Sequence, residues 1–201
     1  AVDDIQIAEA PTNTANFTFT CGGNNTVAFT NASSLCGSNF LWNFDDPTSG
    51  SNISTNENPS HVFTAPGTYN VALTVTFPGN NIKTINKQVT VVSVNPVVTN
   101  DISCHGYNNG SILADVVPTT GTYTFLWNTT PVQTTQTINN LVAGNYTVQV
   151  AGINVCATTA SITLTEPAQL VVGMEIINAL CSKPNGTLNA AVTGGRSEEH
   201  T

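Results

Sequence analysis

The sequence FLWNF at residues 40–44, followed by PGTYNVALTV at residues 66–75, decides the fold of this chain. A second copy of the same pair follows as YTFLWN at residues 123–128 and AGNYTVQV at residues 143–150. Side chains of a β-strand point alternately to opposite faces, so each of these segments predicts a strand with one apolar face. Such faces are buried when two sheets pack together, and the duplication therefore predicts two β-sandwiches in tandem.

Four aromatic residues of the duplicated segments are the predicted core. Trp42 and Trp127 lie in the aromatic strands, and Tyr69 and Tyr146 open the strictly alternating strands. A buried Trp on one sheet opposite a Tyr-led strand on the other is the core arrangement of an immunoglobulin-like sandwich. The predicted fold class is therefore all-β, with tandem immunoglobulin-like β-sandwich domains.

Composition supports the all-β prediction and excludes several function classes. Charged residues are only 8% of the chain, so helix-favouring Lys and Glu are scarce and few helices are expected. The net charge of −8 argues against nucleic acid as a partner, because phosphates need a basic face, and against an anionic membrane surface. No apolar run approaches the length of about eighteen residues that spans a membrane, so no membrane insertion is expected.

Turn signals and repeats divide the chain into segments. We expect the first sandwich at residues 17–93 and the second at residues 97–166, with a boundary at Val94-Asn95-Pro96. The sequence CSKPNGTLNAAV that begins at Cys181 repeats the opening of the second copy, CHGYNNGSILADV, which begins at Cys104. Residues 170–195 are therefore predicted to start a truncated third repeat.

The two ends of the chain carry separate expectations. Residues 1–10 alternate in polarity, are similar to the closing strand of a jelly-roll domain, and are predicted to close an upstream domain. The same residues lack the basic region and apolar core of a signal peptide, so we expect an internal fragment of a longer protein. Residues 196–201, RSEEHT, are encoded by AGA TCG GAA GAG CAC ACG, the start of a common sequencing adapter, and are interpreted as an artefact rather than as a native charged loop.

The first sandwich carries a double motif, WNFDDP at residues 42–47 and then HVF at 61–63 with PGTYNV at 66–71. In these segments it resembles the PKD (polycystic kidney disease) domain, whose hallmark is Trp-Asp-Phe-Gly-Asp-Gly, then His-x-Tyr and Pro-Gly-Thr-Tyr-x-Val. Asn43 replaces an acid of that pattern, and Asp45 and Pro47 replace glycines, so the turn after Phe44 is expected to differ from that of the family. The resemblance implies an extracellular module for spacing and for protein or carbohydrate contact, without catalysis, and a structural role for His61.

The second sandwich resembles the SprB-type repeat of large surface adhesins of gliding bacteria. The residues that carry this resemblance are Cys104, Asn109-Gly110-Ser111, Tyr123 to Trp127, Ala143 to Val150, Cys156, Ile162-Thr163-Leu164 and Pro167. The resemblance implies tandem arrays on cell-surface proteins that gliding-associated secretion systems export.

Five cysteines in a chain of this length suit an oxidising compartment better than the cytosol. Each proposed sandwich contains two of them, which predicts the disulfides Cys21–Cys36 and Cys104–Cys156, with Cys181 left for a partner outside the sequence. The alternative is a metal site or thiol chemistry. No Cys-x-x-Cys is present, and His105, the only adjacent histidine, lacks further ligands in the sequence.

Asn43, Asp45 and Asp46 form a cluster of oxygen-bearing side chains in the turn after the first aromatic strand. Calcium prefers several carboxylate and amide oxygens held on such a loop, so these three residues are the predicted metal ligands. The alternative is that the two aspartates cap the turn through local hydrogen bonds. No other cofactor is expected.

The inventory of catalytic residues is thin. Of the three histidines, His200 belongs to the suspected artefact and His61 is expected to be structural, and no phosphate loop or paired-histidine zinc motif is present. The sequence therefore predicts no enzyme but a structural and adhesive segment of a secreted bacterial cell-surface protein of the gliding-motility adhesin type. Its expected partners are surface polysaccharide or protein ligands, bound weakly and multivalently. The alternative function is the non-catalytic tail of a secreted protease or glycoside hydrolase.

Overall fold

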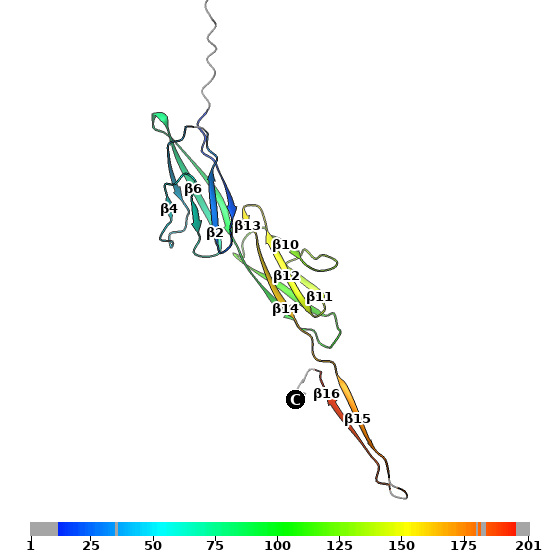
Figure 1. The fold of residues 1–201 in the computed structure, drawn as a ribbon. Helices are drawn as coiled ribbons and strands as arrows, with labels where there is room; N and C mark the ends of the chain where they lie inside the picture. Colours follow the sequence, from blue (N-terminus) through cyan, green and yellow to red (C-terminus); the bar gives the residue numbers. More distant parts are fainter. Residues whose placement is uncertain (1–11, 35, 180, 182–183, 196–201) are drawn as a thin grey trace, which may run out of the picture. The chain divides into compact units, whose positions relative to one another are not determined.

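The computed structural model describes residues 12–34, 36–179, 181 and 184–195. The strand predicted at residues 1–10 and the adapter-like residues 196–201 lie outside this part of the chain. The described residues form β-strands and one 3-10 turn, which confirms the all-β prediction, and none of their helices is long and apolar enough to cross a membrane. The chain divides into two compact units (Figure 1). The first unit consists of Ala1–Ser93, Val116–Tyr123 and Val150–Thr158. The second unit consists of Val94–Asp115, Thr124–Gln149 and Thr159–Thr201.

The first unit is a sandwich of two sheets. The smaller sheet has the order β1-β2-β5 and the larger sheet has the order β13-β7-β6-β3-β4. The strands of the smaller sheet are β1 (Phe17–Cys21), β2 (Thr26–Asn31) and β5 (Ser60–Val62). The strands of the larger sheet are β3 (Asn39–Asn43), β4 (Ile53–Ser54), β6 (Gly67–Phe77), β7 (Asn81–Val91) and β13 (Val155–Cys156).

The long hairpin β6–β7 is the framework of the larger sheet. The two strands pair antiparallel over their whole length, from Gly67 opposite Val91 to Phe77 opposite Asn81. The turn between them, Pro78–Asn80, contains Gly79 at φ 77°, in the left-handed region that glycine adopts without steric cost. This turn lies at the position where the sequence PGNN predicts a hairpin.

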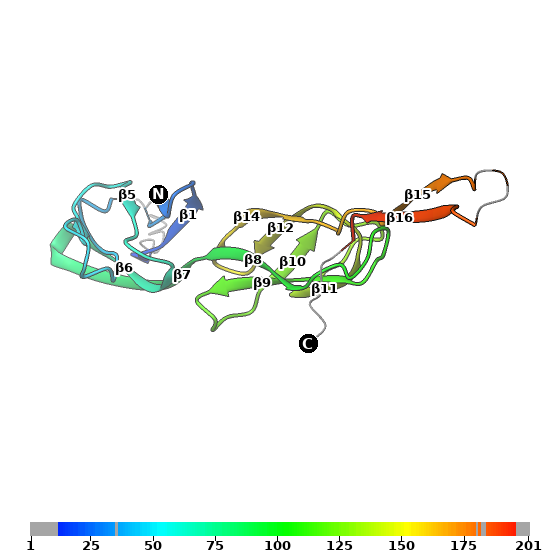
Figure 2. The ribbon, with the colours of Figure 1, turned by 90° about the horizontal axis from the view of Figure 1, so that it is seen from below.

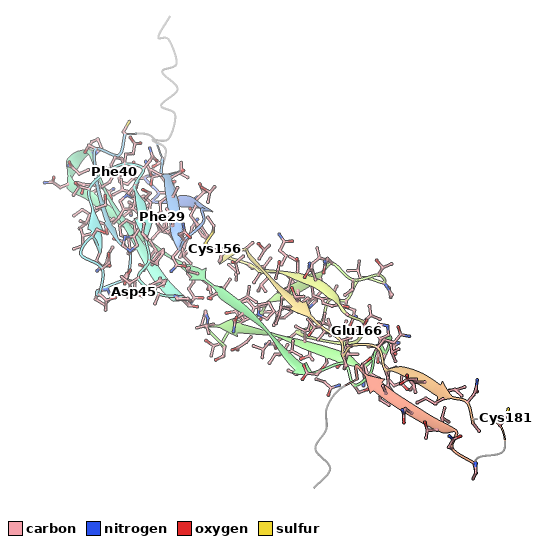
Figure 3. The ribbon with its side chains drawn as sticks, turned by 60° about the horizontal axis from the view of Figure 1, so that its bottom comes forward. Phe29, Phe40, Asp45, Cys156, Glu166 and Cys181 are labelled. Atoms are coloured by element: carbon pink, nitrogen blue, oxygen red, sulfur yellow. A yellow bond between two sulfur atoms is a disulfide. The ribbon has the colours of Figure 1, made fainter. Side chains whose placement is uncertain are left out.

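Aromatic side chains of both sheets fill the core of the first unit. Trp42 from β3 is fully buried, and the centroid of its ring lies 5.1 Å from Phe17 on β1 and 5.4 Å from Phe29 on β2. Phe29 is labelled in Figure 3. The indole nitrogen of Trp42 donates a hydrogen bond to the carbonyl of Asn56 at 2.9 Å, so its one polar group is satisfied inside the core. Alternate residues of β6 complete the core: Val71, Leu73, Val75 and Phe77.

The second unit repeats the two-layer arrangement with three strands in each layer (Figure 2). Its sheets have the orders β10-β12-β14 and β11-β9-β8. Trp127 from β10 is 1% exposed and donates its indole N–H to the carbonyl of Thr135 at 3.0 Å, as Trp42 does in the first unit. The strands are β8 (Ser93–Asn100), β9 (Gly110–Val117), β10 (Thr124–Trp127), β11 (Thr137–Leu141), β12 (Gly144–Ala151) and β14 (Thr158–Leu164).

A tyrosine corner occurs at the same place in both copies. The Tyr69 hydroxyl donates to the carbonyl of Ala65 at 2.7 Å, and the Tyr146 hydroxyl donates to the carbonyl of Val142 at 2.8 Å. Tyr146 is buried, whereas Tyr69 is only partly buried against the core. Burial raises the pKa of both phenols above the usual 10.0, so each hydroxyl keeps its proton and remains a donor.

The segment that repeats the start of the second copy forms a two-stranded antiparallel hairpin. Strand β15 (Val171–Ile177) pairs with β16 (Thr187–Thr193), and Cys181 lies at the tip of the hairpin (Figure 3). Every residue of both strands is exposed. An isolated hairpin of two strands is marginally stable because it has no buried face of its own. The start of a truncated third repeat at residues 170–195 stays a prediction.

Candidate functional site

The turn that follows β3 holds the three predicted calcium ligands. The Asn43 side-chain oxygen accepts a hydrogen bond from the Asp45 backbone N–H at 3.0 Å, and an Asp45 carboxylate oxygen accepts one from the Asn70 N–H at 2.9 Å. Asp45, labelled in Figure 3, has φ 59° and is exposed. Both side chains therefore stabilise the turn and fasten it to the start of β6, as the turn-capping alternative requires.

Asp46, the third predicted ligand, points into the protein and is 1% exposed. One carboxylate oxygen accepts hydrogen bonds from the hydroxyls of Thr48 at 3.0 Å and Thr64 at 2.7 Å. The other accepts from the Thr64 N–H at 2.9 Å and from Nε2 of His61 at 3.1 Å. Burial alone would raise the pKa of Asp46, but the bonds from Thr64, His61 and Thr48 outweigh it and lower the pKa below the usual 3.8.

His61 is enclosed by aromatic rings. Its imidazole stacks on Phe44 with centroids 4.3 Å apart and meets the edge of Phe63 at 4.7 Å, and the residue is 2% exposed. Because the Asp46 carboxylate is ionised at neutral pH and can only accept, Nε2 of His61 carries the donated proton. The pair therefore links β5 to the turn after β3 inside the core of the first unit.

The three predicted ligands are thus engaged with protein donors rather than converging on one point. Among the described residues, no group of three or more His, Cys, Asp or Glu side chains is placed to hold a metal ion. Calcium binding by Asn43, Asp45 and Asp46 stays a prediction. The sequence reasoning missed that Asp46 and His61 form one buried pair, although both were singled out separately.

The buried carboxylate leads to a prediction about acid stability. Since the pKa of Asp46 is lower in the folded protein than in the unfolded chain, its contribution is complete above pH 3.8 and is lost as the pH falls through the folded value. We expect Asp46→Asn to lower the free energy of unfolding of the first unit by about 2 kcal/mol at pH 7, because the four hydrogen bonds that the carboxylate accepts lose their charged acceptor. The difference from wild type should shrink below pH 3.8.

Urea unfolding at pH 7 and at pH 2.5 measures this change. The lower pH lies about one unit below the usual pKa of an aspartate, 3.8. Asp115→Asn, which removes an exposed carboxylate of the second unit, is the matched control and should leave the unfolding of the first unit unchanged. A constant difference between Asp46→Asn and wild type at both pH values would contradict the role given to this carboxylate.

Both predicted disulfides are wrong, because Cys21 is bonded to Cys156. The two cysteines are 135 residues apart in sequence, with their Cα atoms 5.3 Å apart. The Cys21–Cys36 pair fails because Cys21 faces Val27 at the turn end of the β1–β2 hairpin, whereas Cys36 follows Asn31 at the other end. Two ends of a five-residue strand are separated by more than a disulfide can span.

The Cys104–Cys156 pair fails because the segment Val150–Thr158 belongs to the first unit and Cys104 belongs to the second. We call this segment the arm. Within it, β13 pairs parallel with the end of β7, Val155 opposite Thr90 and Cys156 opposite Val91. The Thr90 N–H also donates to the carbonyl of Asn154 at 2.8 Å. The arm is therefore held in the first unit by backbone pairing as well as by the disulfide.

The other cysteines are exposed thiols: Cys36, Cys104 and Cys181. Beside Cys104, Nδ1 of His105 lies 3.0 Å from a carboxylate oxygen of Glu166, and the other oxygen of Glu166 accepts the Gly106 N–H at 2.7 Å. Glu166 lies two residues after the end of β14, so this contact fixes the Cys104 turn to the segment after that strand.

Known protein families include one whose sequence pattern matches the first sandwich. The sequence profile described as the PKD domain matches residues 8–92. The first sandwich is a PKD domain. Its resemblance to that family, predicted from residues 42–47, 61–63 and 66–71, is confirmed, and the buried Asp46–His61 pair lies within those motifs. The resemblance of the second sandwich to SprB-type repeats stays a prediction.

Solved structures similar to the chain include two further PKD domains. The PKD1 domain from the Vibrio cholerae metalloprotease PrtV is 28% identical, with 39% of this chain and 94% of that chain covered and a TM-score of 0.34. The PKD1 domain of Vibrio anguillarum Epp is 27% identical, with 39% and 90% covered and a TM-score of 0.34. Fibronectin(III)-like modules of Clostridium thermocellum CbhA are 14% identical, with 75% of this chain and 94% of that chain covered and a TM-score of 0.31. No curated protein matches the chain.

Proposed function

We propose that this chain is a non-catalytic, extracellular accessory segment of a secreted protease or glycoside hydrolase, in which the PKD domain and the following sandwich act as a spacer. The observation that carries the proposal is the PKD domain at residues 8–92, since domains of this family often follow such catalytic domains. The disulfide Cys21–Cys156 supports an oxidising, extracellular location.

The chemistry of the PKD domain suits a spacer. Its most enclosed polar residues, Asp46 and His61, are used for hydrogen bonds inside the fold. Its core is a continuous set of aromatic and aliphatic side chains, and His61 packs against the ring of Phe44 within this core. A residue acts in catalysis only where it can reach a substrate, and this arrangement instead gives a rigid module.

A second candidate function is an adhesive segment of a bacterial surface protein with SprB-type repeats. The observation in its favour is the repetition of the Cys104 segment at Cys181, which suits a tandem array. In such an array, weak contacts with surface polysaccharide or protein gain strength from copy number. The coding sequence that flanks this segment in the source DNA distinguishes the two candidates: a catalytic domain upstream supports the accessory segment, and further repeats on both sides support the adhesin.

The proposal predicts that the isolated chain hydrolyses no glycan or peptide and binds surface ligands more weakly than about 1 µM as a monomer. Display of many copies on one bead should raise the apparent affinity for the same ligand by about a hundredfold or more, because the second and later contacts become intramolecular. The measurement compares monomer and bead on insoluble polysaccharide, on fibrous protein and on whole bacterial cells. Turnover that survives repurification, or submicromolar binding by the monomer, would show a dedicated site and contradict the spacer function.

A further inference from the structure

Each of the three repeated hairpins carries a cysteine at its turn. Cys21 ends β1 before the turn to β2, Cys104 lies between β8 and β9, and Cys181 lies between β15 and β16. A short asparagine-containing sequence follows each of them, at residues 24–25, 108–109 and 185–186. These turn cysteines occupy equivalent positions in successive modules. Cys156 does not lie at such a turn but ends strand β13 in the arm.

The first of these turns shows what a turn cysteine binds. Cys21 is bonded to Cys156 of the arm, and the arm adds β13 as the last strand of the sheet β13-β7-β6-β3-β4. The arm runs in sequence from the end of β12, the strand that contains Tyr146, to the first residue of β14. The first module is therefore completed by a segment that the next module in the sequence supplies. A cavity of only about 90 Å³ remains beside the disulfide, lined by residues 22–26, 91–92 and 156–158.

The second module offers the same sheet edge. Strands β12 and β14 correspond to β6 and β7, because each pair consists of the Gly-x-Tyr strand and the last strand of its module. In the order β10-β12-β14, β14 is the outermost strand, and no strand in the part of the chain that the structure describes pairs with its outer edge (Figure 2). An open edge presents backbone N–H and C=O groups that a further strand can pair with, as β13 pairs with β7.

The second turn cysteine lies beside a larger cavity. Its volume is about 470 Å³, and it is lined by Ser103, Cys104, His105, residues 167–170 and Gly195. Glu166 holds His105 and the Gly106 N–H, so the turn is fixed next to the segment that leaves β14. The corresponding elements of the first module, residues 22–26 after Cys21 and residues 91–92 at the end of β7, line one small cavity together with residues 156–158 of the arm. The exposed Cys104 thiol, the cavity and the open edge thus reproduce the three features that receive the arm in the PKD domain.

We propose that the Cys104 turn and the outer edge of β14 form a docking site for the arm of a following module, a further copy of the repeat at residues 97–166. In this site Cys104 forms a disulfide with the residue of that copy equivalent to Cys156. Both thiols lose their hydrogens as the S–S bond forms, and the two protons and two electrons pass to a disulfide oxidant such as oxidised glutathione, which becomes two thiols. This inference goes beyond the proposed function, since it applies to tandem modules in an enzyme tail and in an adhesin alike.

An extended chain tests the proposal directly. Residues 1–173 followed by a second copy of residues 97–166 place the copied Cys104 at the position of Cys181 and keep the native spacing between turn cysteines. After folding in a glutathione redox buffer, free thiols are alkylated and the peptides are mapped without reduction. We expect Cys104 linked to the copied Cys156, Cys21 linked to Cys156, and alkylation of Cys104 at least about tenfold lower than that of Cys36, because linkage of the modules raises the effective concentration.

The native disulfide serves as the internal control for folding in the same molecule. Alkylated Cys104 in molecules that have formed Cys21–Cys156, or a bond between the copied Cys104 and the copied Cys156, would overturn the proposal. The matched variant Cys104→Ser should return the copied Cys156 to the alkylated pool and leave Cys21–Cys156 intact. A copied Cys156 that stays oxidised in this variant would equally rule the docking site out.

The native chain gives a second test that does not depend on the folding of the extension. A synthetic peptide with the sequence of residues 150–158 carries thionitrobenzoate on its cysteine, so attack by a protein thiolate forms a new disulfide and releases the coloured thiol. The chain presents three exposed thiols, and we expect capture at Cys104 about tenfold faster than at Cys36 or Cys181. A peptide of scrambled sequence should abolish the preference. Equal rates at the three cysteines with the native peptide would overturn the proposal.

Discussion

Replacement of Trp42 by alanine is expected to lower the free energy of unfolding of the PKD domain by about 3–5 kcal/mol, the loss found when a fully buried large aromatic is truncated. Trp42 is 0% exposed, contacts the rings of Phe17 and Phe29 from the opposite sheet, and satisfies the carbonyl of Asn56. Its removal therefore leaves a cavity at the junction of the two sheets and an unpaired carbonyl. Chemical denaturation followed by circular dichroism measures the loss.

The chain supplies close controls for this substitution. Leu41, the preceding residue of β3, is 48% exposed on the outer face of the same strand, so Leu41→Ala should change the stability by less than about 0.5 kcal/mol. Trp127→Ala should cost the second unit a similar 3–5 kcal/mol, with the exposed Leu126 as its control. In Trp42→Ala the remaining tryptophan reports on the second unit, whose transition should be unchanged. A tryptophan that can be removed from either unit without loss would contradict the assigned core.

Much of this fold is readable from the sequence because strand periodicity is local. The alternation after Tyr69 correctly predicts that Val71, Leu73 and Val75 face the core, and the structure buries all three. The sequence PGNN predicts the β6–β7 hairpin because a short turn of glycine and asparagine joins two consecutive strands that pair with each other antiparallel. Both features depend on neighbours within a few residues, which is the range over which sequence patterns are informative.

The disulfide could not be predicted in the same way, because it depends on a pairing between distant segments. Counting two cysteines per sandwich assumes that each domain is contiguous in sequence, whereas the arm leaves the second module and joins β7. One signal was present: Cys21, Cys104 and Cys181 all precede an asparagine-containing turn, so they are equivalent and do not pair with one another. That equivalence leaves Cys36 and Cys156 as possible partners of a turn cysteine, and the sequence does not choose between them. Only the pairing of β13 with β7 identifies Cys156 as the partner and Cys21 as the turn cysteine to which it is bonded.

The Asp46–His61 pair was missed for a related reason. The sequence places Asp46 next to Asp45 in a polar turn, where a metal ligand and a turn cap have the same appearance. Their side chains differ only after folding, when Asp46 is 1% exposed and Asp45 remains at the surface. Burial of one carboxylate among Thr48, Thr64 and His61 is a tertiary event, and no spacing rule in the sequence encodes it.

Removal of the disulfide by the double substitution Cys21→Ser with Cys156→Ser is expected to destabilise the PKD domain by up to about 5 kcal/mol. The bond joins residues 135 positions apart, and the loop-closure entropy that it removes from the unfolded chain grows with that separation. Strand β13 has only two residues, so backbone pairing with Thr90 and Val91 alone gives the arm little independent stability. We therefore expect the arm to open while the rest of both sandwiches stays folded at moderate temperature.

Hydrogen exchange of the backbone amides distinguishes this result from general loss of structure. The Thr90 N–H, which donates to Asn154, and the amides of β13 should exchange much faster in the double variant, whereas the amides of the central strand β6 should stay protected. Cys36→Ser removes an exposed thiol and is the matched control, with no expected change in stability or exchange. Unchanged protection of the arm in the double variant would mean that backbone pairing holds it without the disulfide. The bond would then add only unfolded-state entropy, and the arm would dock before Cys21 and Cys156 are oxidised.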